Sequence, residues 1–329
     1  MFSKKIVFVI LFLLVQVYAL YSQANTLNSK IKLDTTYRLG LDILALAPAG
    51  SNIAFGDENG NIYLMDSLHN ILETPVKHTG WINSISNKGD SLLVNGSDGC
   101  ITIFDVATNS VKQKIKISDE TIKQSDFISD SILLVLSDNL SLLNTKSGKI
   151  TRTFPFTRDV SCMALIPDRQ RIILGFTDGS ITVFDINTSK SITRLLKHKN
   201  KITAFAISKD RRQLLSGDAT GIVTLWQLSD YSMKKSFQAN DNEISSIAFS
   251  DDAKYFITAG WDKNVKIWNK ANFKLEQNIT AHTNIVSAIL FHKDKLFTAS
   301  YDNTIKVWNP REAGVDSLPL FQRVTKEQR

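Results

Sequence analysis

The chain has 329 residues, of which 22% are charged and 43% are hydrophobic, and its formal net charge is +7 at pH 7. This composition excludes an intrinsically disordered chain, and so small a net charge argues against a surface built to bind nucleic acid. The whole chain has two cysteines, which excludes a fold held together by several disulfides.

The N-terminal segment has the organisation of a secretory signal. Two lysines near the start are followed by an apolar run over residues 6–20 and by a Ser-Gln-Ala triplet that ends at Ala24. We expect residues 1–24 to be a signal peptide, so that the protein is exported to a periplasmic, secreted or other extracytoplasmic location. The alternative is an uncleaved anchor that tethers the protein to a membrane through residues 6–20. No second long apolar run follows, and we expect no other membrane contact.

After this segment the chain repeats one short phrase up to residue 309. Its clearest copy runs from Asp302 to Trp308, with a tight turn followed by a strand in which apolar and polar residues alternate. The residue in the place of Trp308 is aromatic or apolar in every copy, and successive anchors are 39 to 42 residues apart. The seven anchors are Met65, Phe104, Leu143, Phe184, Trp226, Trp268 and Trp308. Such regular spacing predicts seven copies of one structural unit.

The repeat predicts an all-β fold. Each copy has four short strand-like segments, and a sheet this small cannot bury both of its faces alone. Stacking the sheets radially buries them and leaves few open edges. We therefore predict a seven-bladed β-propeller of four-stranded antiparallel blades over residues 25–309. The copy over residues 111–143 is the weakest, and we keep it as a degenerate blade. The polar C-terminal tail, residues 310–329, is expected to be poorly ordered.

The two ends of the repeat predict how the ring closes. No strand follows Trp308, because the segment that begins with Asn309-Pro310 breaks the pattern. A spare strand-like segment, Lys30 to Arg38, precedes the first copy. We expect it to pair with Thr304–Trp308 as the outer strand of blade seven.

Blade one allows more detailed predictions. Residues 43–47 are nearly all apolar, which is typical of a strand buried on both faces, and residues 48–52 are expected to form the turn that follows. Residues 57–61, Asp-Glu-Asn-Gly-Asn, resemble the start of a calcium loop but lack its further acidic ligands and terminal glutamate. We interpret them as a hairpin turn.

These features resemble the WD-repeat (β-transducin-like) family over about residues 30 to 309. In that family a His, a Ser or Thr, an Asp and a Trp hydrogen-bond to one another and fix each blade. Blade seven matches all four, blade six has Asn240 in place of His, and blade five has Asp218 two residues early. Blade two has His78 with Asp98 and Phe104. The resemblance implies a structural role for His78, His198, Ser216, Thr258, Asp262, Trp268, His282, Thr298, Asp302 and Trp308.

No motif in the sequence indicates catalysis. The histidines occupy the family's structural position or lie in turns, and no zinc-protease, paired-cysteine, nucleophile-elbow or phosphate-loop motif is present. We predict no catalytic residue, no metal and no cofactor. Cys100 and Cys162 fall two blades apart, which is too distant for a disulfide.

The resemblance implies a binding surface on one rim of the central channel. In the family the loops that enter the innermost strands, together with residues beside the turn aspartate, form that rim and often bind partners. The corresponding residues here are Trp81, Arg158, Lys201, Glu243, Trp261, Ile285 and Tyr301. Exposed aromatic residues are enriched among binding anchors, and Trp261 and Tyr301 are expected to lie close together on adjacent blades. The alternative is that these aromatic residues only pack over their own turns.

The favoured hypothesis is an exported, non-enzymatic interaction platform that binds other proteins, does not bind nucleic acid and is monomeric when isolated. One alternative is a small-ligand binder or hydrolase-like enzyme that uses the central channel. Another is a structural subunit of a cell-envelope complex that makes contacts through the edges of its blades. A fold alone does not decide among these functions.

Overall fold

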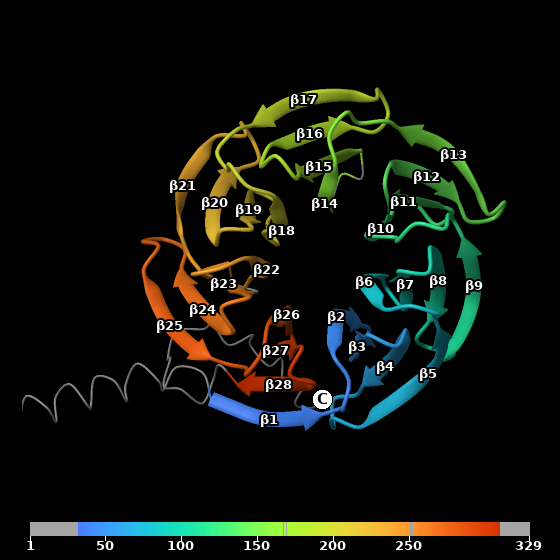
Figure 1. Cartoon of the computed structure of the whole chain (residues 1–329), viewed down its shortest axis with the longest axis horizontal. Helices are drawn as coiled ribbons and strands as arrows, with labels where there is room; N and C mark the ends of the chain where they lie inside the picture. Colours follow the sequence, from blue (N-terminus) through green and yellow to red (C-terminus); the bar gives the residue numbers. More distant parts are fainter. Residues whose placement is uncertain (1–31, 167, 169, 251–252, 310–329) are drawn as a thin grey trace, which may run out of the picture.

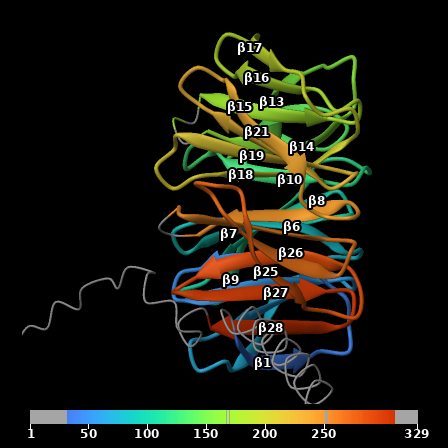
Figure 2. The same cartoon turned by 90° about the vertical axis from the view of Figure 1, so that its left-hand side faces the viewer.

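The computed structural model describes residues 32–166, 168, 170–250 and 253–309, which form a ring of seven sheets around a central axis (Figure 1). Every sheet has four strands, and every strand pairing is antiparallel. Seen from the side, the ring is a disc whose strands run across its thickness (Figure 2). The predicted all-β, seven-bladed propeller is confirmed. The predicted signal or anchor and the C-terminal tail lie outside the described residues.

In the first six blades the chain runs from the channel outward. Blade one has β2 (Ile43–Ala49), β3 (Asn52–Asp57), β4 (Asn61–Met65) and β5 (Ile71–Lys77). Blade two has β6 (Ile82–Lys88), β7 (Ser91–Gly96), β8 (Cys100–Asp105) and β9 (Ser110–Lys116). Blade three has β10 (Gln124–Phe127), β11 (Ile132–Leu136), β12 (Leu140–Asn144) and β13 (Lys149–Phe154). The weakest sequence copy is therefore a complete blade.

Blades four to six repeat this order. Blade four has β14 (Val160–Leu165), β15 (Arg171–Phe176), β16 (Ile181–Asp185) and β17 (Lys190–Leu195). Blade five has β18 (Ile202–Ile207), β19 (Gln213–Asp218), β20 (Ile222–Gln227) and β21 (Met233–Gln238). Blade six has β22 (Ile244–Phe249), β23 (Tyr255–Gly260), β24 (Asn264–Asn269) and β25 (Leu275–Thr280).

Blade seven combines both ends of the propeller. It has β26 (Val286–His292), β27 (Lys295–Ser300) and β28 (Thr304–Asn309), and its outer strand is β1 (Lys32–Arg38) (Figure 1). β1 pairs with β28 along its length, from Lys32 opposite Asn309 to Arg38 opposite Thr304. Beyond the strand, the Leu39 N–H donates to the Asn303 carbonyl at 2.9 Å. The predicted closure by the N-terminal strand is confirmed.

The sequence repeat and the sheet are offset by one strand. In the sequence, each copy of the repeat begins with the strand-like segment that precedes its channel-side strand, such as residues 71–76 for the second copy. In the structure that segment is β5 and belongs to blade one. Each sequence copy therefore spans two sheets, and the connection between the blades lies inside the copy.

The first strand of blade one differs from the prediction. β2 continues through Pro48 and Ala49, so Gly50 and Ser51 alone separate it from β3. Pro48 is tolerated because β2 is the edge strand on the channel side, where a missing N–H leaves no ladder bond unmade. Burial alternates along β2, with its odd-numbered residues buried and the others partly exposed. The strand is thus buried on one face and not on both.

The predicted hairpin turn over residues 57–61 is confirmed. β3 ends at Asp57 and β4 begins at Asn61. The Asp57 carboxylate accepts hydrogen bonds from the backbone N–H groups of Asn59 (2.9 Å) and Asn61 (2.8 Å). An aspartate that bonds to the backbone in this way stabilises a turn.

The hydrophobic core is divided among the seven joints between blades. Each anchor packs against the blade before it: Trp308 lies with residues of blade six, and Trp226 lies with residues of blade four. Met65 in blade one packs against Phe297 and Val307 of blade seven. The joint that closes the ring therefore has an apolar core like the other joints.

A belt of hydrogen bonds also links the blades around the channel. In six blades the second residue of the channel-side segment donates its side chain to a carbonyl of the next blade. The donor and acceptor pairs are Asn83–Ile122, Lys123–Val160, Ser161–Ile202, Thr203–Ile244, Ser245–Val286 and Ser287–Ile43. The equivalent residue in blade one is Leu44, which has no side-chain donor. The belt therefore crosses the closing joint between blades seven and one and is interrupted between blades one and two.

No helix long and apolar enough to cross a membrane occurs in the described ranges. Cys100 begins β8 in blade two, Cys162 lies in β14 of blade four, and both are free thiols. Their predicted separation is confirmed.

Candidate protein-interaction surface

One recurring backbone hydrogen bond defines a single rim of the channel. In six blades the N–H of the residue after the second strand donates to the carbonyl of the residue just before the first strand. The donor and acceptor pairs are Glu58–Asp42, Ser97–Trp81, Thr177–Asp159, Ala219–Lys201, Trp261–Glu243 and Tyr301–Ile285. We call these twelve residues the rim. In blade three the Lys123 N–H donates to the Leu136 carbonyl instead, so this blade has no equivalent pair.

Six of the seven predicted binding residues lie on the rim. Trp81, Lys201, Glu243 and Ile285 occupy the position before the first strand, whereas Trp261 and Tyr301 occupy the position after the second. The Trp261 N–H donates to the Glu243 carbonyl, with an N···O distance of 2.9 Å. The sequence prediction missed the other six rim residues, which are Asp42, Glu58, Ser97, Asp159, Thr177 and Ala219. Aligning the blades at the first buried residue of each channel-side strand would have found two of them.

Arg158 is not equivalent to the other predicted residues. The rim position of blade four belongs to Asp159, one residue later. The Arg158 guanidinium bonds to the Asp178 carboxylate at 3.3 Å and to the Ser180 hydroxyl, and it lies 4.2 Å from the centre of the Phe176 ring. Its charge is therefore paired within its own turn. The assignment shifted by one residue because the sequence signal of blade four, which lacks the structural histidine, is weak.

The two rim tryptophans differ in how they are held. Trp81 is 51% exposed, and its indole N–H donates to the Asn83 side chain at 3.0 Å. Trp261 is 47% exposed, and its indole N–H has no hydrogen-bond partner among the described residues. Trp261 and Tyr301 lie on adjacent blades, as predicted, but Glu243 connects them and no ring contact between them is recorded for the described part of the chain. Trp261 is thus a large apolar surface with an unused donor.

The rim over blades six, seven and one is electrostatically coupled. Partial burial raises the pKa of Tyr301, and the negative charges of Asp42 and Glu243 raise it further. Burial also raises the pKa of Glu243 against the opposing effect of Lys201, and burial together with Glu58 and Asp302 raises the pKa of Asp42. Neither carboxylate forms an ion pair within the described residues. The negative charges of Asp42 and Glu243 therefore both act on Tyr301, and Lys201 partly offsets the charge of Glu243.

The polar residues predicted to fix the blades form the expected chain in blade seven. The His282 ring bonds through Nδ1 to Asp302 at 3.0 Å and through Nε2 to Thr298 Oγ1 at 2.7 Å. The Trp308 indole N–H donates to the same hydroxyl at 3.0 Å. All of these atoms lie inside the blade. The ring nitrogens of His282 are thus fully occupied by structural bonds.

Blade five forms the same chain despite its early aspartate. Asp218 is the last residue of β19, and its carboxylate lies 2.7 Å from His198 Nδ1. Ser216 Oγ bonds to His198 Nε2 and accepts from the Trp226 indole, both at 2.8 Å. Asp218 thus reaches the histidine from the end of the strand, whereas Asp98, Asp262 and Asp302 lie two residues beyond the end of theirs.

Blade six replaces histidine with an amide. Asn240 Nδ2 donates to both carboxylate oxygens of Asp262 at 3.0 Å, and its Oδ1 accepts from Thr258 at 2.6 Å. The Trp268 indole completes the chain to Thr258 at 3.1 Å. The mostly buried Lys266 ammonium lies 3.1 Å from Asp262. An asparagine supplies one donor and one acceptor, as a neutral histidine does.

Blade two reaches the same result with another partner. Its anchor is Phe104, which has no N–H, and Val94 occupies the place of the hydroxyl residue opposite Thr102. His78 bonds to Asp98 at 2.8 Å, and its Nε2 bonds to Thr102 Oγ1 on β8 at 2.9 Å. Blade two thus lacks both the indole N–H donor and the hydroxyl that accepts from it in blades five to seven. Neither group is left buried without the other. The sequence prediction missed Thr102, although the joint absence of Trp and Ser/Thr indicates such a change.

The comparisons agree with this geometry. A family model described as "WDR36/Utp21 first beta-propeller" matches residues 35–271, and a second, "WD domain, G-beta repeat", matches residues 273–309. The chain belongs to the WDR36/Utp21-type WD-repeat propeller family. The WD repeat-containing protein 55 of Arabidopsis thaliana is a more distant relative, 23% identical over 112 residues. The match covers 32% of this WD-repeat chain and 32% of the relative, so the chain matches about a third of that protein's length.

The WD-repeat network predicts acid sensitivity. Burial lowers the pKa of His78 and of His282 despite their carboxylate partners. Burial opposes ionisation of Asp98 and Asp302, but hydrogen bonds, among them those from the histidines, outweigh it and lower both pKa values to about 2. All four groups thus stabilise the fold above the pKa values that they have in the unfolded chain. As pH falls, the histidine contribution is lost first, below about 6.5, and the aspartate contribution is lost below about 4.

We expect the melting temperature to fall between pH 7 and pH 5 and to fall more steeply towards pH 2. The double variant His78→Asn, His282→Asn copies the amide of blade six, which does not titrate. Its melting temperature at pH 7 should be lower, but its decrease from pH 7 to pH 5 should be smaller than that of the unmodified protein. An equal decrease in both proteins, measured by thermal unfolding across pH, would show that these histidines do not cause it.

Proposed function

We propose that this WD-repeat propeller is a non-enzymatic platform that binds another protein through the rim, centred on Trp261 and Tyr301. WD-repeat propellers generally bind other proteins. The observation that carries the proposal is Trp261, a half-exposed tryptophan whose indole N–H has no partner in the described structure and whose backbone is fixed by Glu243. A rigid aromatic side chain with an unused donor is typical of a binding hot spot.

The neighbouring residues support the same section of the rim. Tyr301 is partly buried, and its backbone N–H donates to the Ile285 carbonyl at 3.1 Å, so part of its conformational freedom is already restricted before a partner binds. Pre-organised side chains lose less entropy on binding. His198 and His282, in contrast, are held in the blade networks by both ring nitrogens, which supports a structural role over an enzymatic one.

Replacing Trp261 with alanine should weaken the partner complex by about 30-fold or more, the effect of losing a hot spot of roughly 2 kcal/mol. Tyr301→Ala should weaken it as well. Both side chains are outside the blade networks, so both variants should melt within about 2 °C of the unmodified protein, as surface substitutions usually do. Affinity capture followed by titration of the captured partner measures the first effect, and thermal unfolding measures the second.

Leu275→Ala is the matched control, because Leu275 is 43% exposed on the outer edge of the same blade. It should leave partner binding unchanged. If Trp261→Ala lowers stability and binding together, the loss of binding reflects unfolding and the proposed surface is wrong.

Export of the propeller is part of the proposal. Its support is the N-terminal pattern of charge, apolar run and small residues in residues 1–24. The mass of the mature protein purified from its own cells tests it: a chain that begins at Asn25 agrees with cleavage after Ala24. An intact chain found in the soluble intracellular fraction would contradict export.

A further inference from the structure

The seam between blades four and five contains two pockets, one at each end of β20. The first, of about 360 Å³, lies between the β17–β18 connection and blade five and includes Ile222, the first residue of β20. The second, of about 260 Å³, includes Gln227, the last residue of that strand. Five steps of about 3.3 Å separate the two residues, so the pockets are roughly 17 Å apart.

Both pockets are lined by basic residues. Lys197 and Lys199 line the first pocket, and Arg211 and Arg212 line the second together with Arg171. Arg171 is paired with Asp168 at 2.5 Å, but the other four form no ion pair among the described residues. We call these four residues the basic seam.

The outer strands on either side add positive charge and no negative charge. β17 carries Lys190 and Arg194, β21 carries Lys234 and Lys235, and neither strand contains an acidic residue. None of these four forms an ion pair with another described residue. On the outer strand β9, in contrast, Lys112, Lys114 and Lys116 each lie within 4 Å of an aspartate carboxylate. The outer strands of the seam thus add only positive charge, while Asp168 and Asp210 lie at its arginine end.

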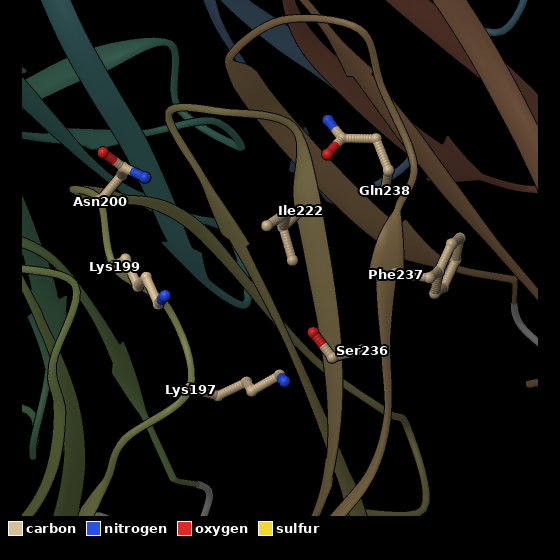
Figure 3. A pocket seen from close by; sticks show the side chains of 7 residues that line it. All are labelled: Lys197, Lys199, Asn200, Ile222, Ser236, Phe237 and Gln238. Carbon is tan, nitrogen blue, oxygen red and sulfur yellow. The ribbon is translucent and has the colours of Figure 1, made fainter.

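The lining of the first pocket favours a peptide as its occupant. Figure 3 shows Lys197 and Lys199 on one side of Ile222, with Lys197 extended towards Ser236. Phe237 also lines the pocket, but its ring points away from Ile222 (Figure 3) and packs against Trp268 in blade six, with ring centroids 4.9 Å apart. The pocket thus offers cations and an aliphatic surface but no aromatic face on which a nucleic-acid base could stack.

We propose that the basic seam binds an extended acidic segment of a partner protein, with carboxylates at the lysine and arginine ends and an apolar side chain over Ile222. An extended segment of five or six residues spans the distance between the pockets. Complementary charge attracts such a segment and fixes its register. This surface borders the rim at Asn200, next to Lys201, but lies two blades from Tyr301 and does not include Trp261, and the inference does not depend on the function proposed there.

The test uses a fluorescein-labelled twelve-residue peptide of repeating Glu-Glu-Leu and measures polarisation with the full chain. Lys197→Gln, Lys199→Gln should weaken binding about fivefold or more, Arg212→Gln about twofold or more, and Ile222→Thr about twofold or more. The control Lys112→Gln, Lys116→Gln removes the same charge from β9 and should change the affinity by less than about twofold. Thermal unfolding confirms that each variant is folded.

Two further probes separate the alternatives. Twelve-nucleotide oligothymidine should bind more weakly than the peptide and should not respond to Ile222→Thr; tighter binding of the oligonucleotide would overturn the peptide proposal in favour of a nucleic-acid surface. The peptide proposal would also be overturned if the seam and control variants lost equal peptide affinity, or if the unmodified chain did not bind the peptide. Trp261→Ala should leave peptide binding unchanged, which distinguishes failure of this inference from failure of the rim proposal.

Discussion

Deleting residues 25–40 should lower the melting temperature by about 10 °C or more. The deletion removes β1 and with it the ladder to β28 at six paired positions. At about 1 kcal/mol net for each hydrogen bond, and at least about 2 °C for each kcal/mol in a domain of this size, the ladder alone accounts for that decrease.

The deletion also opens the joint between blades seven and one. Tyr37 and Leu39 pack against its apolar core, and Lys295 pairs with Asp34 on β1 at 2.8 Å. The Tyr37 ring contacts the His69 ring of blade one edge-on, with centroids 5.7 Å apart. Without β1, β28 becomes an exposed edge strand, which favours aggregation.

The matched control is deletion of residues 25–31, which leaves β1 complete. That variant should melt within about 2 °C of the unmodified protein, because nothing in the propeller ladder is removed. Equal melting temperatures for the two deletions would show that β1 does not close the ring. Thermal unfolding followed by circular dichroism measures both.

The second large effect concerns the blade network. Thr298→Val should lower the free energy of unfolding by about 2–4 kcal/mol, because it leaves the Trp308 N–H and the His282 Nε2 buried without their partner. The substitution changes the shape of the side chain very little. The loss is therefore one of hydrogen bonding rather than of packing.

Blade two provides the compensating residues. There Val94 stands with Phe104, and Thr102 on the neighbouring strand satisfies the histidine. In blade seven, Lys306 lies opposite Thr298. It therefore occupies the place that Thr102 has opposite Val94 in blade two. The triple variant Thr298→Val, Trp308→Phe, Lys306→Thr transfers this arrangement to blade seven. It should recover about half of the stability lost in Thr298→Val, because His282 regains a hydroxyl partner and the Trp308 N–H is removed, whereas the Ala281 carbonyl loses its bond from Lys306.

Urea unfolding of the single and triple variants measures both free energies. The triple variant could instead be less stable than Thr298→Val, by the summed free-energy costs of Trp308→Phe and Lys306→Thr. In that case the blade-two arrangement of hydrogen bonds cannot replace that of blade seven. That result would contradict the claim that Thr298→Val is destabilising because it leaves buried groups without hydrogen-bond partners.

The architecture was predictable because its signals are regular. Anchors 39 to 42 residues apart fixed the number of blades, and the spare strand before the first copy matched the strand missing after Trp308. Detail was lost where a local signal was weak or ambiguous. Pro48 suggested a turn, but an edge strand facing the channel accepts proline.

Half of the rim was predicted from the sequence. Six rim residues directly precede a strand that starts with a buried Ile or Val, and position along the chain found four of these six. Arg158 was misplaced because blade four lacks the histidine that sets the alignment. The basic seam was not predictable, since its lysines and arginines come from separate strands and turns that only the folded ring brings together.

The central claim is that the rim at Trp261 contacts a partner protein. The most direct test replaces Trp261 by the photoreactive residue p-benzoylphenylalanine in cells that produce the protein, with the same replacement at Leu275 on the outer edge of the same blade. The account predicts a distinct cross-linked partner from position 261 and none of that species from position 275. A folded protein that gives no cross-link from position 261, or the same one from both positions, would contradict it.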